Sequence, residues 1–174
     1  MIFYSSYYLL FLVMCLSAPR TDRGRLECML AFQAMIVGSF ISFAIFLIAP
    51  VEVGGRDNLD DPGLLSSMFS SLHAVDPPFN SWPSLHVLDT IIASWFIVRW
   101  WTVDGSRRAM FSIAIPMWTL CALIALSTLT TKQHYIWDIV TAAALALLLL
   151  WVTRRGLDAM DVTIAAARFE ADLS

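Results

Sequence analysis

CMLAFQAMIVGSFISFAIFLIAPV, residues 28–51, is an apolar stretch without a single charged side chain, and it decides the fold class. An α-helix needs a run of about twenty apolar residues to cross the hydrocarbon core of a bilayer. Three more uncharged runs occupy residues 2–18, 109–131 and 139–153. Because a helix satisfies its own backbone hydrogen bonds inside lipid, these runs predict an all-α, integral membrane helical bundle.

The composition agrees with a membrane protein of one domain. Apolar residues make up 59% of the 174 residues and charged residues 14%, which lies outside the range of soluble globular proteins. A chain of this length has room for one domain, so we expect residues 1–174 to form a single membrane domain. We expect membrane lipids around it, and no nucleic acid or obligate protein partner. The three cysteines have no paired spacing, which favours small buried side chains.

A fifth apolar segment, residues 85–101, is interrupted by Asp89 near one end and by Arg99 near the other. We count it as a span because the loops on both sides of it require a crossing. About five transmembrane helices are therefore predicted, over residues 2–18, 26–50, 84–102, 109–130 and 135–153. Outside the spans, residues 64–72 predict a short helix along the membrane surface, and the tail 156–174 a short amphipathic helix.

The arginines of the loops predict how the bundle is oriented in the membrane. They gather in loop 19–25, in loop 102–108 and directly after the last span, whereas the long loop 51–82 is acidic. Loops rich in arginine and lysine face the cytoplasm. We therefore expect the acidic loop, the connection 127–134 and the N-terminus on the extracytoplasmic side of a plasma membrane, or of an inner membrane if the protein is bacterial.

Polar side chains gather at one predicted membrane depth. Ionisable residues within spans are energetically costly, so they are candidates for function. Four are expected at the outer ends of the third and fifth spans: His86, Asp89, His134 and Asp138. Further polar side chains expected at that depth are Arg56, Ser84, Ser127, Thr130, Thr131 and Lys132. Three spans thus bring polar groups to one face, which indicates a functional site.

His134 and Asp138 are four residues apart, so they share one face of a helix. The carboxylate can accept the proton of one ring nitrogen and leave the other nitrogen free to attack. Two other interpretations remain open. The pair is also typical of a simple helix-end hydrogen bond. With His73 or His86 as a third ligand, the same spacing would suit a metal site.

Residues 80–86, NSWPSLH, are predicted to begin the third span. Proline is favoured in a first helical turn and Ser81 is a possible N-cap, so free amides would point outward there. Such a helix end binds phosphate, Ser84 adds a hydroxyl, and His86 could give a proton to a leaving oxygen. The alternative is an ordinary capped helix start. Asp89 could orient the His86 ring, or it could extend to the membrane surface as a helix-end carboxylate.

Together these segments resemble the type 2 phosphatidic acid phosphatase superfamily. Residues 83–86, PSLH, match its Pro-Ser-Gly-His motif with one change. Residues 127–138 match its Ser-Arg-x5-His-x3-Asp motif with every spacing intact. Leu85 and Thr128, the two departures, are the variants found in the inositol phosphorylceramide synthase branch. The resemblance covers residues 26–153, which it identifies as the catalytic core.

The remaining family motif, Lys-x6-Arg-Pro, has Arg56 as its candidate. Ala49 stands where the motif has lysine, and Asp57 where it has proline. The arginine that follows the motif serine is also absent, since Thr128 holds that position. Lys132 could replace one of these cations, or it could be an ordinary surface lysine. The family core has six spans, so the first is missing here, as in a shortened or truncated chain.

The resemblance also implies a mechanism without metal or cofactor. His134 would be the nucleophile that forms a phosphohistidine, with Asp138 to orient it. His86 would protonate the leaving alcohol and later activate the acceptor. The implied phosphate-binding residues are Arg56, Ser84, Ser127 and Lys132. Such a site suits phosphoryl transfer, which depends mostly on positioning and charge stabilisation.

We therefore expect an enzyme that acts on a lipid phosphate or diphosphate. Water as acceptor would make it a phosphatase, which the small chain favours. A lipid or inositol hydroxyl would make it a transferase of the synthase type. The rivals from other classes are a transporter or proton relay, which also needs ionisable residues in spans, and an inactive membrane fragment. A metal-dependent hydrolase is a third.

Overall fold

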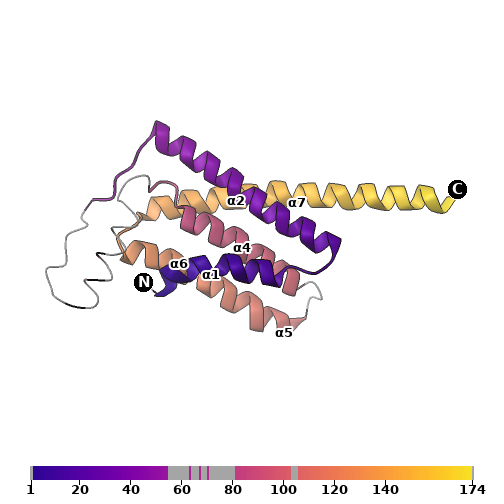
Figure 1. Ribbon diagram of the computed structural model, residues 1–174, viewed down its shortest axis with the longest axis horizontal. Coiled ribbons are helices and arrows are strands. Elements are labelled where there is room, and N and C mark those ends of the chain that lie inside the picture. Colours follow the sequence, from indigo (N-terminus) through magenta and orange to yellow (C-terminus); the bar gives the residue numbers. More distant parts are fainter. Residues whose placement is uncertain are drawn as a thin grey trace.

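The computed structural model describes residues 2–54, 81–102 and 106–173, together with Gly63, Ser67 and Ser70. Its regular elements are helices, in the order α1 (Ile2–Ser17), α2 (Asp22–Ile48), α4 (Leu85–Trp101), α5 (Arg107–Ala109), the π-helix η1 (Met110–Ala114), α6 (Ile115–Thr130) and α7 (Ile136–Leu173). They form an elongated bundle in which α2 crosses its neighbours obliquely (Figure 1). The predicted all-α bundle is confirmed.

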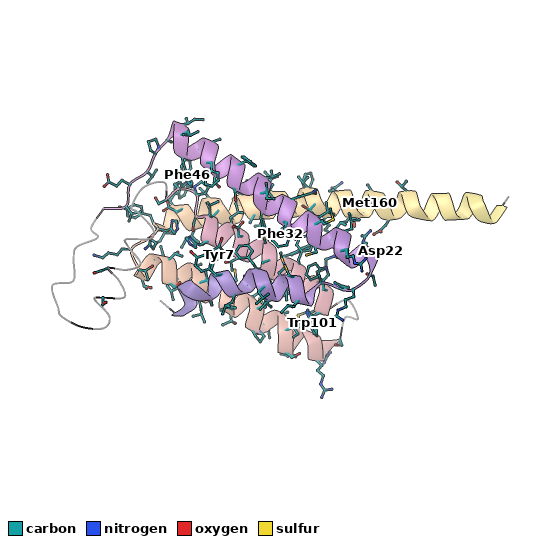
Figure 2. All side chains as sticks on the ribbon, in the orientation of Figure 1. Tyr7, Asp22, Phe32, Phe46, Trp101 and Met160 are labelled. Atoms are coloured by element: carbon teal, nitrogen blue, oxygen red, sulfur yellow. The ribbon has the colours of Figure 1, made fainter. Side chains whose placement is uncertain are left out.

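Helix α4 is the centre of the bundle, because it contacts α1, α2, α6 and α7. Its buried side chains are Val87, Leu88, Asp89, Thr90, Ile92, Ala93, Ser94, Phe96 and Ile97. Leu88, Ile92 and Phe96 are fully buried in the main core cluster. Phe32 of α2 packs against that cluster (Figure 2). Protein rather than lipid therefore surrounds most of α4, which explains how this apolar helix tolerates Asp89.

Three segments are long and apolar enough to cross a membrane: Asp22–Ile48, Met110–Thr130 and Ile136–Asp161. Most of their side chains are not buried inside the protein, and large apolar ones such as Phe40 and Leu47 are exposed. Exposed apolar faces of this size are suited to lipid and not to water. The chain is therefore a membrane protein. Helices α1 and α4 are shorter, with 16 and 17 residues, and α4 packs against α1 and all three of these segments.

Small residues let α2 approach α4 and α7 closely. A Cβ atom added at Gly38 would lie 2.8 Å from Leu88 Cδ2 and 3.0 Å from Leu149 Cδ1. One turn later, the buried Ser42 hydroxyl donates to the Gly38 carbonyl oxygen over 2.9 Å. Membrane helices associate through such close packing, because the surrounding lipid is as apolar as their side chains. The crossing holds α4, which carries His86, against α7, which begins just after His134.

Two helices differ from the sequence prediction. The fifth span and the tail form one helix, α7, which projects beyond the rest of the bundle (Figure 1). Gly156 does not end it, because one glycine lowers helix stability by only about 1 kcal/mol. The fourth span begins with α5 and the π-turns of η1, directly before Pro116. Proline lacks an amide hydrogen and clashes with the preceding turn, so wider turns fit there. Most of predicted helix 64–72 lies outside the described residues.

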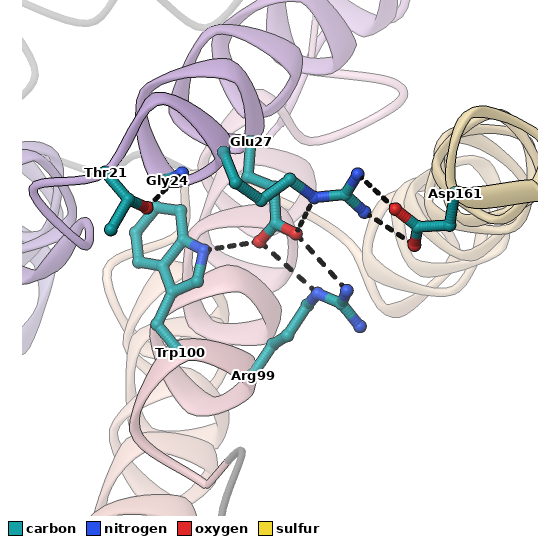
Figure 3. Close-up of polar contacts among 7 residues, drawn as sticks. Thr21, Gly24, Glu27, Arg99, Trp100 and Asp161 are labelled. Carbon is teal, nitrogen blue, oxygen red and sulfur yellow. Dashed lines mark hydrogen bonds and ion pairs between the residues drawn. The ribbon is translucent and has the colours of Figure 1, made fainter. Parts of the chain in front are cut away.

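A polar network joins α2, α4 and α7 at one end of the bundle, here called the arginine end because it carries Arg23 and Arg99 (Figure 3). The buried Glu27 carboxylate accepts hydrogen bonds from Arg23 Nε over 3.0 Å and from Trp100 Nε1 over 2.8 Å. Arg99 Nη2 lies 3.3 Å from the same carboxylate. Arg23 also binds both oxygens of Asp161, over 2.6 and 3.0 Å. The network therefore fixes three helices opposite the candidate histidines.

Candidate active site

The candidate histidines lie at the other end of α4, here called the histidine end. His134 lies in the tight connection between α6 and α7. The Thr128 carbonyl oxygen accepts hydrogen bonds from the amides of Gln133, over 2.9 Å, and His134, over 3.2 Å. Lys132 adopts a left-handed conformation with φ 53°, which is common where the chain leaves a helix. The backbone thus turns sharply after α6 and presents the His134 ring toward the start of α4.

His134 is held by a backbone carbonyl as well as by the predicted carboxylate. Its Nδ1 lies 2.8 Å from the Ser81 carbonyl oxygen and 3.4 Å from Asp138 Oδ2. Asp138 Oδ2 also accepts the amide hydrogen of Tyr135 over 2.9 Å. A carbonyl oxygen can only accept, so the hydrogen of the neutral ring belongs on Nδ1. The lone pair of the neutral ring is then on Nε2.

The Nε2 atom of His134 is the ring nitrogen that could act on a ligand. It is buried and has no hydrogen-bond partner among the described residues. The whole residue is only 9% exposed. An imidazole nitrogen with a free lone pair and a fixed tautomer is a competent nucleophile. The Ser81 contact was not predicted, since a backbone carbonyl leaves no signal in a sequence.

The start of α4 differs from the predicted one. The N-cap is Ser84 rather than Ser81, and Pro83 precedes the helix instead of lying in its first turn. The Ser84 amide donates to the Asp138 carbonyl oxygen over 3.2 Å, which ties the starts of α4 and α7 together. The Ser84 hydroxyl is fully buried and has no partner among the described residues. Its role as a phosphate-binding residue stays a prediction.

The His86 ring lies beside the His134 ring, with 5.8 Å between their centroids. The Tyr7 ring of α1 also packs against the His86 ring in a T-shaped contact, with 4.8 Å between the two centroids. The Tyr7 hydroxyl donates to Asp89 Oδ2 over 2.9 Å. Asp89 is only 7% exposed, so the interpretation of a carboxylate that extends to the membrane surface is wrong. Sequence analysis missed Tyr7, although a tyrosine hydroxyl inside an apolar span needs a partner.

The other predicted phosphate ligands are less directly placed. The Ser127 hydroxyl is buried and donates to the Ile124 carbonyl oxygen over 2.7 Å, so it would have to rotate to reach a phosphate. Thr128, at the position of the family arginine, is fully buried and bonded to the Ala125 carbonyl oxygen over 2.8 Å. Lys132 is exposed. Arg56 lies outside the described residues.

The metal-site interpretation of this region receives no support from side-chain geometry. Within residues 2–54, 81–102 and 106–173, no three His, Cys, Asp or Glu side chains are grouped to hold a metal ion. His73, one of the ligands considered, lies outside those residues. The described residues instead bring together two imidazoles, those of His134 and His86, and the buried Ser84 hydroxyl.

Long apolar helices in a bundle, with a histidine pair at one end, are typical of an enzyme that crosses the membrane several times. The model of the PAP2 superfamily matches residues 58–159, more than half of the chain. The chain belongs to the PAP2 superfamily, whose members are phosphatases and phosphotransferases. The match includes α4, α6 and the membrane part of α7. Neither curated proteins nor solved structures gave a match.

Proposed function

We propose that this protein is a membrane-embedded enzyme that removes or transfers the phosphoryl group of a lipid phosphate or diphosphate through a phosphohistidine on His134. The observation that carries the proposal is the state of that ring. Nδ1 is bonded to the Ser81 carbonyl oxygen, and Nε2 has no partner among the described residues. A ring held in this way needs little rearrangement before it attacks phosphorus.

The first half-reaction forms a bond between His134 Nε2 and phosphorus as the bond to the leaving oxygen breaks. His86 gives its proton to that oxygen, so the alcohol departs neutral. The Asp138 carboxylate, 3.4 Å from Nδ1, offsets the positive charge that develops on the ring. With ring centroids 5.8 Å apart, the two imidazoles can flank one phosphoryl group.

The second half-reaction returns the enzyme to its starting state. His86, now neutral, takes a proton from the acceptor hydroxyl. The acceptor oxygen then attacks phosphorus, and the bond to Nε2 breaks. Ser84 and the first turn of α4 would hold the phosphoryl oxygens, since the positive end of the helix dipole attracts anions. Arg56, Ser127 and Lys132 are the further ligands proposed.

Water is the acceptor we favour. A lipid or inositol hydroxyl is the second candidate, and Leu85 and Thr128 favour it because they resemble the inositol phosphorylceramide synthase branch. We propose that the site faces the extracytoplasmic side, and the arginine bias of the loops supports this orientation. We propose that the reaction needs no metal, because a ring nitrogen of His134 attacks phosphorus directly and the Ser81 carbonyl oxygen favours the neutral tautomer with its lone pair on Nε2.

The test is phosphate release by purified protein from a panel of lipid phosphates and diphosphates, in EDTA. Incubation with inositol or diacylglycerol distinguishes transfer from hydrolysis. We expect turnover in EDTA and an acid-labile phosphoprotein that is absent from His134→Ala. Turnover lost in chelator and restored by zinc or magnesium would instead indicate a metal-dependent hydrolase. Activity that persists in His134→Ala would contradict the covalent route.

A further inference from the structure

An open cavity of 860 Å³ lies at the arginine end, far from the histidines along α4. Helices α4 and α6, with η1, form its walls, and α7 closes it with one side chain. The lining residues that matter here are Trp95, Arg99, Met110, Trp118, Thr119 and Arg154. Apolar side chains thus form the walls, and two arginines lie where the cavity meets the arginine end.

The cavity is elongated along the bundle. Its lining on the η1–α6 side runs from Met110 to Ala122, about 18 Å at the helical rise per residue. The hydrocarbon core of a bilayer is about 30 Å thick, so the cavity spans roughly one leaflet. Trp118, Thr119 and Ala122 are exposed rather than covered by other helices. An acyl chain lying along α6 would fit such a groove.

The charge in the cavity is positive after the neighbouring ion pairs are taken into account. Glu27 and Asp161 are matched by Arg99 and Arg23 in the network of Figure 3. Arg154 is exposed, and no carboxylate pairs with it among the described side chains. Arg99 is 36% exposed, so its guanidinium remains open to the cavity on the side away from Glu27. An anion is therefore the complementary ligand.

We propose that this cavity is a binding site for an anionic phospholipid, separate from the catalytic site. The lipid phosphate binds Arg99 and Arg154, and one acyl chain lies along Trp95 and Trp118. Basic pockets between transmembrane helices on the arginine-rich side are suited to anionic head groups. The aromatic lining residues Trp95 and Trp118 suit the depth of the lipid head groups, where tryptophan is enriched in membrane proteins. The lipid comes from the leaflet that adjoins the arginine end.

Binding is measured by native mass spectrometry of the full-length protein, released from micelles that contain phosphatidylglycerol or phosphatidylcholine at equal concentration. Phosphatidylglycerol is a phosphodiester, so it is no substrate for the proposed phosphatase. All variants carry His134→Ala, which prevents turnover at the catalytic site and leaves any lipid binding there the same in every variant. We expect preferential retention of phosphatidylglycerol, and Arg154→Gln should reduce it about fivefold, the worth of one basic residue near an anionic surface. Arg155→Gln is the matched control, because Arg155 stacks on Trp151 instead of lining the cavity.

A second pair of variants tests the groove without changing charge. Thr119→Trp fills the cavity, and Leu126→Trp adds the same bulk to an exposed position of α6 outside it. Only Thr119→Trp should reduce retention. Equal retention of the two lipids, or equal losses in Arg154→Gln and Arg155→Gln, would overturn the proposal. The proposal would also be overturned if a second copy of the chain occupied the groove and this dimer dissociated in the Thr119→Trp variant. None of these outcomes depends on whether the protein is a phosphatase.

Discussion

The Nδ1 atom of His134 lies 2.8 Å from the carbonyl oxygen of Ser81, a residue that precedes it by more than fifty positions. The segment before α4 thereby sets the tautomer of the candidate nucleophile. The family motif would assign that role to Asp138 alone, yet this carboxylate is farther away, at 3.4 Å. The Ser81 carbonyl oxygen and the Asp138 carboxylate are therefore both acceptors for the hydrogen on His134 Nδ1.

Replacement of Asp138 by asparagine should lower the rate of phosphate release less than a catalytic triad would suggest. Loss of the triad carboxylate in serine proteases costs about 10⁴-fold, largely through the wrong histidine tautomer. Here the Ser81 carbonyl still selects the correct tautomer, so we expect about 10²-fold in Asp138→Asn. The measurement is steady-state turnover of purified variants. A loss as complete as that of His134→Ala would mean that the carboxylate alone fixes the ring.

Tyr7→Phe should destabilise the protein, because Asp89 would lose its hydrogen bond at a buried position. A buried polar group left without its partner costs about 1–3 kcal/mol. The remaining ring should still lie against His86. Tyr8→Phe is the matched control, since Tyr8 is 60% exposed. The measurement is thermal unfolding in a mild detergent. Equal melting temperatures of the two variants would contradict a structural role for the Tyr7 hydroxyl.

Glu27→Gln should be the most destabilising change at the arginine end. It leaves two arginines without their shared, buried carboxylate, and breaking a buried ion pair costs about 3–5 kcal/mol. Asp22→Asn removes an exposed pair with Arg25 and should cost less than about 1 kcal/mol. Chemical unfolding of both variants compares the two losses. Similar small losses would show that the network of Figure 3 contributes little to stability.

The orientation of the bundle can be tested by chemical labelling. Arginine-rich loops should face the cytoplasm, so a cysteine introduced by Ser106→Cys should be protected in intact cells, and one introduced by Asp60→Cys should react. The background carries serine in place of Cys15, Cys28 and Cys121, and the reagent does not cross membranes. Permeabilised cells, in which both positions react, are the control. Labelling at Ser106→Cys without labelling at Asp60→Cys would reverse the proposed orientation.

The helices were predictable because the bilayer dictates the length of an apolar segment. The bundle has helices at all five predicted spans, although α2 begins at Asp22, where Thr21 caps it through the Gly24 amide. Details decided by tertiary contacts were not predictable. The start of α4 is set by the bond between the Ser84 amide and the Asp138 carbonyl oxygen. No local pattern encodes such a contact.

The candidate site was also predictable only in part. His86 and His134 were paired by sequence, because ionisable side chains in apolar spans must face other protein groups. The contact with the Ser81 carbonyl oxygen was not predicted, because every residue has a backbone carbonyl. Tyr7 was not predicted, because aromatic residues are common in membrane spans. Its hydrogen bond to Asp89 distinguishes it from the neighbouring aromatic residues.

His134 and His86 have different proposed roles, and the choice of leaving group distinguishes them experimentally. An alkyl lipid phosphate expels a basic alkoxide, so loss of a proton donor in His86→Ala should cost about 10²–10⁴-fold. A nitrophenyl phosphate leaves without protonation, so the first turnover of His86→Ala should persist with that substrate. Later turnovers should be slow, because His86 also activates the acceptor. His134→Ala should form no intermediate with either substrate.

The most direct test is a rapid-mixing measurement of nitrophenol release with purified variants at stoichiometric concentration. The account predicts a burst of about one nitrophenol per enzyme from His86→Ala and none from His134→Ala. Equal loss of the first turnover in both variants would contradict the division of roles. A burst from His134→Ala that is absent from His86→Ala would show that the roles are reversed.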